Sequence, residues 1–332
     1  GSYAKVGNAA SFVSIGHSEL LKKFRKELRQ AAALDSALML IGEAGTARTA
    51  FARYIHDISQ RAMNPCIELA SAMLTTTNTE EQILGKENGT EIIPGFIEQA
   101  EEGTLIINGL SDLNSRAQQL LHNILENGQY NRINGNSSLQ IKSRVIAIVD
   151  EGYIQDMQDG RLKRELISNI SIQTLRVLPL RDHAEDVPDF IKFYVDYFVE
   201  VERLTFRRFS IGAQNRLRNY PWPDNLRELK NIIRRLLIEG RDDDVSLDEV
   251  EDQLKNQEVT INSFVKQDLL SLPLREAREK FEQAYLQQQL ILCDGKVGQL
   301  AKRVGVERTH LYRKLKALGI NLDTKIEAKN TN

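Results

Sequence analysis

Short apolar runs alternate with longer stretches of helical periodicity over the first 180 residues of the chain. Runs of strand length lie at 37–41 (ALMLI), 103–109 (GTLIING) and 143–150 (SRVIAIVD). Helical spacing occurs at 49–59 (TAFARYIHDIS) and at 115–128 (SRAQQLLHNILENG). Because β-rich runs that alternate with amphipathic helices are typical of βαβ units, this pattern predicts an α/β domain with a parallel sheet covered by helices.

The second half of the chain has a different pattern. Helical periodicity from 183 to 237 predicts a smaller helical subdomain. Residues 242–252 (DDDVSLDEVED) are strongly acidic and suggest a linker or an exposed helix. A last helical region, from about 274 to 318, is interrupted at CDGKVG and near VGVE. These breaks predict several short helices in a separate C-terminal domain.

Composition restricts the class of protein. With 332 residues, of which 41% are hydrophobic and 27% charged, the chain has the composition of a soluble protein of two or three domains. No apolar run approaches the roughly 20 residues of a membrane helix, and no secretory leader is visible. Cys66 and Cys293 lie far apart in the chain, which favours reduced thiols and a cytoplasmic location. Gly1-Ser2 resembles a tag-cleavage scar, so a natural N-terminal domain is expected to precede it. The five scattered histidines lack metal-ligand spacing, and no metal site is predicted.

Residues 42–49 (GEAGTART) resemble a phosphate-binding P-loop, GxxxxGK(S/T). Gly42, Gly45 and Thr49 fit this frame, but Ala47 and Arg48 replace the second motif glycine and the lysine. Ala47 adds a Cβ where the loop requires glycine's conformational freedom, and Arg48 keeps the charge but not the compact ammonium group. The loop by itself leaves weakened nucleotide binding and no binding equally open.

Three further segments carry a family resemblance: 95–105 (GFIEQAEEGTL), 178–188 (LPLRDHAEDVP) and 220–231 (YPWPDNLRELKN). In this order they resemble the AAA+ domain of bacterial enhancer-binding proteins, the NtrC-like activators of sigma-54. The resemblance implies an α/β fold, an AAA+ P-loop-type parallel sheet with a helical subdomain, followed by an all-α Fis-type helix-turn-helix domain. The expected boundaries are a scar and linker at 1–13, the degenerate α/β subdomain at 14–180, the helical subdomain at 181–240, an acidic linker at 241–270, the helix-turn-helix domain at 271–322 and a tail at 323–332.

The second strand departs from the family pattern GTLFLDE. Its last positions hold the aspartate that binds magnesium and the glutamate that activates water, whereas this chain has Asn108 and Gly109 there. Neither residue carries the charge or accepts the proton that these roles require. Asp112 follows in the next loop and is not expected to replace them.

The arginine-finger and sensor positions differ as well. The family pattern FREDLYYRL aligns with 162–170 (LKRELISNI), which places Lys163 and Asn169 on the two arginine positions and shifts Arg164 by one. Asp150 replaces the sensor asparagine. Arg227 does match the second sensor arginine, with a structural ion pair as its alternative role.

These departures predict a chain that is not an enzyme, with ATP binding left open and no hydrolysis. Only 90–94 (TEIIP) stands where the family carries its sigma-54-contacting GAFTGA loop. A regulator that works with the housekeeping RNA polymerase is therefore expected. The alternatives are a residual ATPase motor that acts with sigma-54, or an architectural DNA-binding protein without a ligand.

The C-terminal segment 295–320 resembles the Fis-type GNxxxAAxxLGIxRxTLYRKLKxLGI. It carries seven Lys or Arg residues against Glu307 alone, and its apolar spacing suits two packed helices joined at Gly305. Arg308, Thr309 and His310 are predicted to contact base edges in double-stranded DNA. The predicted phosphate contacts are Lys302, Arg303, Arg313, Lys314 and Lys316. The preceding helix at 274–295 has an apolar stripe, which in the family pairs two chains and implies a homodimer or higher oligomer at palindromic operators.

A regulatory ligand of the degenerate loop is the last expectation, and cyclic di-GMP is the candidate. Family relatives bind this dinucleotide through arginines, since a guanidinium can pair with guanine edges and with phosphates. Arg53 matches one such ligand residue, Arg181 lies in a segment expected to fold back toward it, and Arg48 adds charge from the loop. The alternative is that Arg53 and Arg181 form surface or inter-domain ion pairs.

Overall fold

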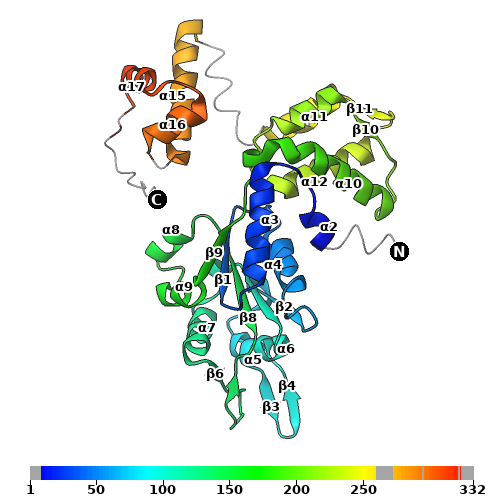
Figure 1. Ribbon diagram of the computed structural model, residues 1–332, viewed down its shortest axis with the longest axis vertical. Coiled ribbons are helices and arrows are strands. Elements are labelled where there is room, and N and C mark those ends of the chain that lie inside the picture. Colours follow the sequence, from blue (N-terminus) through cyan, green and yellow to red (C-terminus); the bar gives the residue numbers. More distant parts are fainter. Residues whose placement is uncertain (1–8, 259–271, 294, 321, 323–332) are drawn as a thin grey trace. The chain divides into compact units, whose positions relative to one another are not determined.

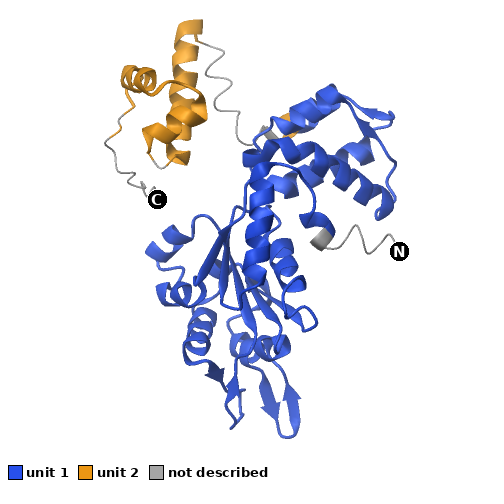
Figure 2. Ribbon diagram, in the orientation of Figure 1, with its two compact units in different colours: residues 1–253 blue, residues 254–332 orange. Residues whose placement is uncertain are grey.

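A computed structural model describes residues 9–258, 272–293, 295–320 and 322 of the chain. The chain divides into two compact units, residues 1–253 and residues 254–332, which Figure 2 distinguishes by colour. Each unit has its own core, and each is described by itself. Within the described residues, no helix is both long and apolar enough to span a bilayer.

The first unit is built on the predicted parallel sheet. The five strands lie in the order β2-β5-β8-β1-β9, and every neighbouring pair is parallel. Their bounds are Leu38–Ile41 (β1), Cys66–Ala70 (β2), Thr104–Asn108 (β5), Arg144–Val149 (β8) and Gln173–Arg176 (β9). Because the strands are parallel, their carboxyl ends share one edge, and the loop 42–49 leaves β1 at that edge (Figure 1). The α/β prediction is confirmed.

Alternating side chains of the strands enter two separate cores. Leu38, Leu40 and Ile106 pack with the first group of helices, and Met39 and Ile107 with the second. The first group is α2 (Ala9–Val13), α3 (Glu19–Ala32) and α4 (Arg48–Asp57); the second is α5 (Thr79–Leu84), α6 (Phe96–Ala100), α7 (Ser115–Asn127), α8 (Tyr153–Gln158) and α9 (Arg164–Ile170). Strands covered on both faces explain the nearly continuous apolar runs of the sequence.

A helical subdomain follows β9, as predicted. It contains η3 (Leu180–Asp186), α10 (Val187–Glu200), α11 (Ile211–Arg218), α12 (Asn225–Glu239) and α13 (Leu247–Glu258), with a short parallel pair β10 (Arg208–Phe209) and β11 (Asp244–Val245). Trp222 is fully buried within it, and its indole N–H donates a 2.7 Å hydrogen bond to the carbonyl of Leu217.

The acidic segment, for which a linker or an exposed helix was expected, contains the helix α13, and part of the segment expected as an N-terminal linker is also folded. In the acidic segment, Val245, Val250 and Leu254 are buried, because these apolar side chains recur between the acidic ones and form one face of α13 and the end of β11. The rest of that segment, from 259, lies outside the described residues. Before residue 14, Phe12 packs on Phe51 with ring centroids 5.7 Å apart, so the end of α2 belongs to the core.

A buried carboxylate ties the start of α3 to the helical subdomain. Asp186, at the end of η3, accepts hydrogen bonds from the backbone N–H of His17 at 2.7 Å and from that of Ser18 at 2.9 Å, and from the Ser18 hydroxyl and the His183 ring. His17, Asp186 and Asp189 also bring three metal-ligand atoms within 4.8 Å of one another. The Asp186 oxygens are already engaged in these bonds, so this cluster has a structural role.

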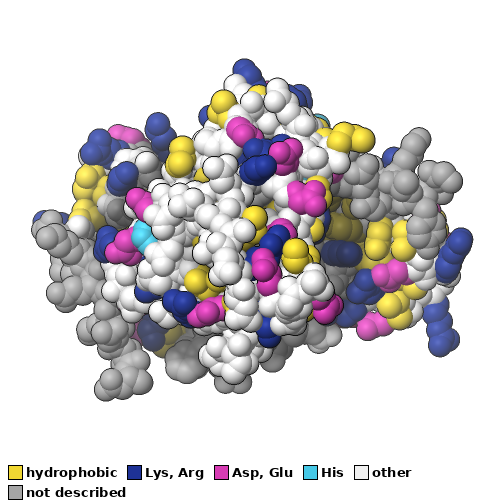
Figure 3. All heavy atoms as spheres, turned by 90° about the horizontal axis from the view of Figure 1, so that it is seen from below, with side chains coloured by type: hydrophobic (Ala, Val, Ile, Leu, Met, Phe, Trp, Pro, Cys, Tyr) yellow, Lys and Arg dark blue, Asp and Glu magenta, His cyan; other side chains and the backbone are white. Residues whose placement is uncertain are grey.

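Two antiparallel hairpins extend from the sheet at the end opposite the helical subdomain (Figure 1). One pairs β3 (Lys86–Asn88) with β4 (Glu91–Ile93), and the other pairs β6 (Gln129–Tyr130) with β7 (Leu139–Gln140). Arg132 joins them to the body through bonds to Glu87 at 2.9 Å and to Glu98 at 2.6 Å. Basic and acidic side chains lie beside one another on the face shown in Figure 3.

The second unit is helical within its described residues, in agreement with the predicted C-terminal domain. Its helices are α15 (Leu274–Leu292), α16 (Val297–Val304) and α17 (Arg308–Ala317). Leu286, Leu300, Leu311 and Leu315 lie in its small core. Gly305 ends α16 with a φ of 71°, a left-handed conformation that favours glycine at this position and turns the chain into α17.

Candidate nucleotide and nucleic-acid sites

Two residues of the loop between β1 and α4 have left-handed backbone conformations. Gly45 has a φ of 81°, and a Cβ added there would lie 2.0 Å from the carbonyl oxygen of Asp224, so only glycine fits. Ala47 immediately precedes α4 and also adopts a left-handed conformation, with a φ of 62°. The Cβ of Ala47 therefore stands at a position that favours glycine, as the sequence predicted, and the chain tolerates it.

Arg48 does not extend into the loop but turns back to the sheet. Its Nη1 donates to the carbonyls of Gly42 and Val149, both at 2.9 Å, and to Asp150 Oδ1 at 2.7 Å. These acceptors follow β1 and end β8, so the guanidinium joins the two strand ends. The two substitutions seen in the sequence, at the lysine and the sensor positions, thus form an ion pair with each other.

A cavity of about 640 Å³ opens beside this loop. Its wall combines backbone and small side chains of the loop with aromatic and basic side chains of the helical subdomain. The lining residues are Phe12, Gly45, Ala47, Arg48, Thr49, Ala50, Arg53, Asn108, Phe193, Tyr194, Tyr197, Leu226, Arg227 and Lys230. Sequence reasoning identified the loop residues, Arg53 and Arg227, but missed the aromatic side chains and Lys230, since the spacing of α10 indicates only burial.

Thr49, Asn108 and Glu68 meet at one side of the cavity. The amide nitrogen of Asn108 donates to the Thr49 hydroxyl and to Glu68 Oε1, at 3.2 Å in each case. Glu68 Oε2 accepts a bond of 3.2 Å from Arg53. Gly109, the other substituted strand position, has a φ of 74° and begins the turn η2 (Leu110–Asp112). Glu68, on β2, is a carboxylate that the sequence analysis did not consider.

Two further arginines near the loop also bind acids. Arg181 makes two bonds to Glu43, at 2.8 and 2.5 Å, and this guanidinium holds the pKa of the Glu43 carboxyl below its usual range. Arg181 is absent from the cavity lining. Arg227 lines the cavity and binds Asp224 at 2.8 Å, which raises the arginine's pKa. The predicted cyclic di-GMP ligands therefore separate: Arg48 and Arg53 share the cavity, and Arg181 pairs elsewhere.

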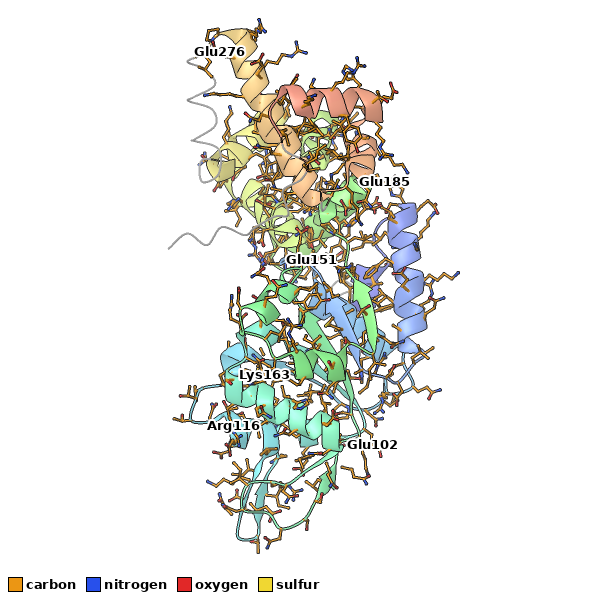
Figure 4. The ribbon with its side chains drawn as sticks, turned by 90° about the vertical axis from the view of Figure 1, so that its left-hand side faces the viewer. Glu102, Arg116, Glu151, Lys163, Glu185 and Glu276 are labelled. Atoms are coloured by element: carbon orange, nitrogen blue, oxygen red, sulfur yellow. The ribbon has the colours of Figure 1, made fainter. Side chains whose placement is uncertain are left out.

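The positions aligned with the arginine fingers lie around α9. Lys163 is the residue before this helix and is labelled in Figure 4, and Arg164 is exposed at its first position. Asn169 packs against α7, where its amide oxygen lies 2.6 Å from the His122 ring and its nitrogen donates to Glu126 at 2.8 Å. Asn169 is therefore engaged within its own chain.

The predicted DNA-contacting side chains gather on α16 and α17. Those that are exposed are Lys302, Arg303, Arg308, Thr309, His310, Arg313 and Lys316. The Arg308 guanidinium lies over the Tyr312 ring, 5.8 Å from its centroid, which orients it at the N-terminal end of α17. Lys314 is half-buried and binds Glu282 of α15 at 3.0 Å, so it is less available to phosphate than its neighbours.

The family models match this architecture in order. Residues 14–176 match the sigma-54 interaction domain, residues 181–265 an AAA+ ATPase lid domain, and residues 277–318 a bacterial regulatory protein domain of the Fis family. The nitrogen assimilation regulatory protein NtrX of Azorhizobium caulinodans is 31% identical over 92% of this chain and 69% of its own length. The chain belongs to the bacterial enhancer-binding protein family. It is thus a DNA-binding transcription regulator of the NtrC-like class.

Other relatives of the enhancer-binding family agree with this assignment. The DNA-binding transcriptional regulator NtrC of Rhizobium meliloti is 30% identical over 73% of this chain and 51% of its own length. NtrX of Brucella abortus has a TM-score of 0.72 at 29% identity, over 92% of this chain and 69% of that one. The same protein in complex with ADP or with ATP has a TM-score of 0.67 at 28% identity, over 92% of this chain and 68% or 69% of that one. This chain spans about two thirds of NtrX and half of NtrC.

The prediction that the chain is not an enzyme is contradicted. The lid matches that of AAA+ ATPases, and an enhancer-binding relative of the same architecture was solved with ADP and with ATP. Both findings point to ATPase activity in the family. The residues of each motif do not reveal groups that come from other strands, such as the Glu68 carboxylate beside Asn108.

Proposed function

We propose that this regulator binds an adenine nucleotide, ADP or ATP, in the cavity beside the loop 42–49, and that the bound nucleotide controls its assembly on DNA. The observation that carries the proposal is the composition of the cavity wall. It combines the loop residues at the start of α4 with aromatic and basic side chains of α10 and α12. Such a wall offers contacts to both ends of a nucleotide.

Each end of the nucleotide has a complementary partner. The N–H groups at the start of α4 and the positive end of that helix attract phosphate. Arg53, Arg227 and Lys230 add positive charge to the same wall. Phe193 and Tyr197 supply aromatic surface for the base. Lys230 lies over the Tyr197 ring, 5.0 Å from its centroid, and burial lowers the pKa of its ammonium group.

Calorimetry with the full chain tests the proposal. ADP and ATP should each bind, and Lys230→Ala should weaken binding at least about tenfold, which is about 1.4 kcal/mol. Lys192→Ala, on the exposed side of the neighbouring helix α10, is the matched control and should bind normally. Absence of heat with either nucleotide contradicts the proposal.

Cyclic di-GMP belongs in the same experiment as a competitor. Its candidate ligands Arg48 and Arg53 line the cavity, whereas Arg181 is bound to Glu43 outside the lining. If cyclic di-GMP binds and Arg181→Ala weakens that binding, the dinucleotide is the regulatory ligand and the Arg181–Glu43 pair opens to receive it. If only mononucleotides bind, the pocket serves ADP or ATP.

We also propose that the regulator contacts RNA polymerase without the GAFTGA loop through which the family contacts sigma-54. The hairpin β3–β4 has only Gly89 and Thr90 between its strands, in place of a long loop. Transcription reconstituted with holoenzyme carrying the housekeeping sigma factor should respond to the regulator. A response limited to sigma-54 holoenzyme contradicts this part.

Pairing of two chains through α15 completes the proposal. Phe281 and Tyr285 stack with centroids 6.0 Å apart, and their side chains are 56% and 42% exposed. Burial of this stripe against a second copy would place two copies of α17 on a palindromic operator. Sedimentation of Phe281→Asp should show a shift toward monomer.

A further inference from the structure

Glu68 contacts two residues of the cavity wall. Glu68 Oε1 and the Thr49 hydroxyl oxygen each lie 3.2 Å from one atom, the amide nitrogen of Asn108. Thr49, Asn108 and Arg53 line the cavity, and Glu68, which is not itself a lining residue, is bonded to Asn108 and to Arg53. The side chains of all three residues are half-buried.

The amide nitrogen of Asn108 contacts both the Thr49 hydroxyl oxygen and Glu68 Oε1, and a small cation could contact the same two oxygens. The terminal carbon of asparagine carries an oxygen acceptor and an NH₂ group with two donors, in one plane. A half-turn of the Asn108 amide exchanges the positions of these two groups and brings its oxygen next to Thr49 and Glu68. The three side chains then offer a hydroxyl, an amide oxygen and a carboxylate. Magnesium prefers such oxygen ligands and is typically held by one or two carboxylates together with substrate phosphates.

We propose that Glu68 supplies the carboxylate of a magnesium site formed with Thr49 and Asn108 for a nucleotide bound in the cavity. This inference rests on the proposed nucleotide binding. Asn108 brings no charge to the end of β5, and Glu68 on the neighbouring strand β2 brings one charge within hydrogen-bond distance of it. The negative charge is thus supplied from the adjacent strand.

The Arg53–Glu68 pair fits a ligand that carries both signs of charge. In the structure Arg53 Nη2 and Glu68 Oε2 lie 3.2 Å apart, and the two side chains are 43% and 24% exposed. A magnesium–nucleotide complex presents a cation to Glu68 and phosphate oxygens to Arg53, which lines the cavity. Binding of this complex then replaces the Arg53–Glu68 pair by two pairs, Glu68 with magnesium and Arg53 with phosphate. A nucleotide without magnesium instead leaves the negative Glu68 beside the negative phosphate, with no cation between them.

Calorimetry of ADP binding to the full chain, with excess magnesium and then with EDTA, tests this role. Wild type should bind ADP at least about tenfold more tightly with magnesium. Glu68→Gln keeps the shape and an oxygen for Asn108 but removes the charge, so the ratio of the two affinities should fall below about twofold. Glu80→Gln, which removes the acid of the Arg116–Glu80 pair in the same unit, is the control and should keep the wild-type ratio.

A second variant protects the test against a folding defect. Glu68→Gln combined with Asn108→Asp moves the carboxylate to β5 and should restore the magnesium dependence. An unchanged magnesium ratio in a Glu68→Gln protein with normal melting overturns the inference, as does a wild type that binds ADP equally well in EDTA. Nucleotide binding itself survives both of those results. No ADP binding under either condition removes the proposed function and the inference together.

Discussion

Basic side chains have different surroundings in the cavity and on the DNA-binding helices. Around the cavity, Arg48, Arg53 and Arg227 each bind an acidic side chain of their own unit. On α16 and α17 most candidate side chains project into solvent, and among the described residues Lys314 is the candidate with an acidic partner.

The two arrangements imply different kinds of binding. Exposed lysines and arginines add their attraction to DNA phosphate directly and release counterions, so affinity falls steeply with salt. A nucleotide phosphate that approaches Arg48 or Arg53 must instead compete with Asp150 or Glu68. The net gain in binding free energy is the difference between the new arginine–phosphate pair and the arginine–carboxylate pair that it replaces. The acidic partners are therefore as important for affinity as the arginines.

The largest expected difference between the two regions comes from a substitution that disrupts the core of the DNA-binding unit. Leu315 is fully buried there, and a buried Leu→Ala substitution costs about 2–5 kcal/mol. A unit with so small a core has little stability in reserve. Leu315→Ala should therefore abolish specific binding to an operator selected from random DNA and leave ADP binding intact. Calorimetric melting should show loss of one transition only. Gln288→Ala, an exposed change on α15, is the control.

Substitutions on α16 and α17 should separate base contacts from phosphate contacts. Arg308→Ala should cost about 1–3 kcal/mol at the selected operator and much less on random DNA. Lys302→Ala should weaken both DNAs equally and reduce the salt slope by about one. Lys314→Ala should have a smaller effect than Lys302→Ala, because Lys314 must leave Glu282 before it binds phosphate. Equal losses from Arg308→Ala on both DNAs would falsify its assignment to base edges.

Regular apolar spacing and the Fis-type resemblance together explain why the helices of the C-terminal unit could be predicted. The apolar period places Leu311 and Leu315 in the core, and it then follows that Arg308 and Arg313 point outward. The parallel sheet was predictable for the same reason. Both predictions depend only on residues close together in the chain.

The cavity could be predicted only in part, because its contacts join distant segments. Arg48 binds Asp150, which is 102 positions later, and Arg181 binds Glu43, 138 positions earlier. Charge and spacing along the chain do not reveal such partners. Phe193 and Tyr197 line the cavity through their place on α10, and the helical period distinguishes buried from exposed faces but not core from cavity wall.

Removal of the acidic partner of Arg48 should leave this cavity arginine without an ion pair to Asp150, as most basic side chains of α16 and α17 are without an acidic partner among the described residues. Asp150→Asn removes the acid but leaves the carbonyls of Gly42 and Val149, so the guanidinium becomes freer to meet phosphate. ADP affinity should rise up to about fivefold, or about 1 kcal/mol, since the Asp150 side chain is 58% exposed and its pair is screened. Glu151 is labelled in Figure 4, and Glu151→Gln, which breaks the adjacent pair with Arg176, should leave affinity unchanged. Weaker binding by Asp150→Asn contradicts this role.

The smallest expected effect concerns two histidines, one buried in the first unit and one exposed in the second. His56 is buried in the first unit, and its Nε2–H donates to the carbonyl of Asn64 at 3.0 Å while Nδ1 lies 2.7 Å from the Thr104 hydroxyl. His310, on α17, is exposed.

Burial lowers the pKa of His56, so the folded unit binds a proton at this ring less readily than the unfolded chain, in which the ring has the ordinary pKa of about 6.5. Preferential protonation of the unfolded state therefore removes stability as the pH falls from neutral to values below about 6.5. The melting temperature of the first unit should drop by a few degrees over this range. In His56→Gln, which keeps a donor for Asn64 but does not titrate, the drop should be smaller. An equal drop in both proteins assigns the acid sensitivity to other groups.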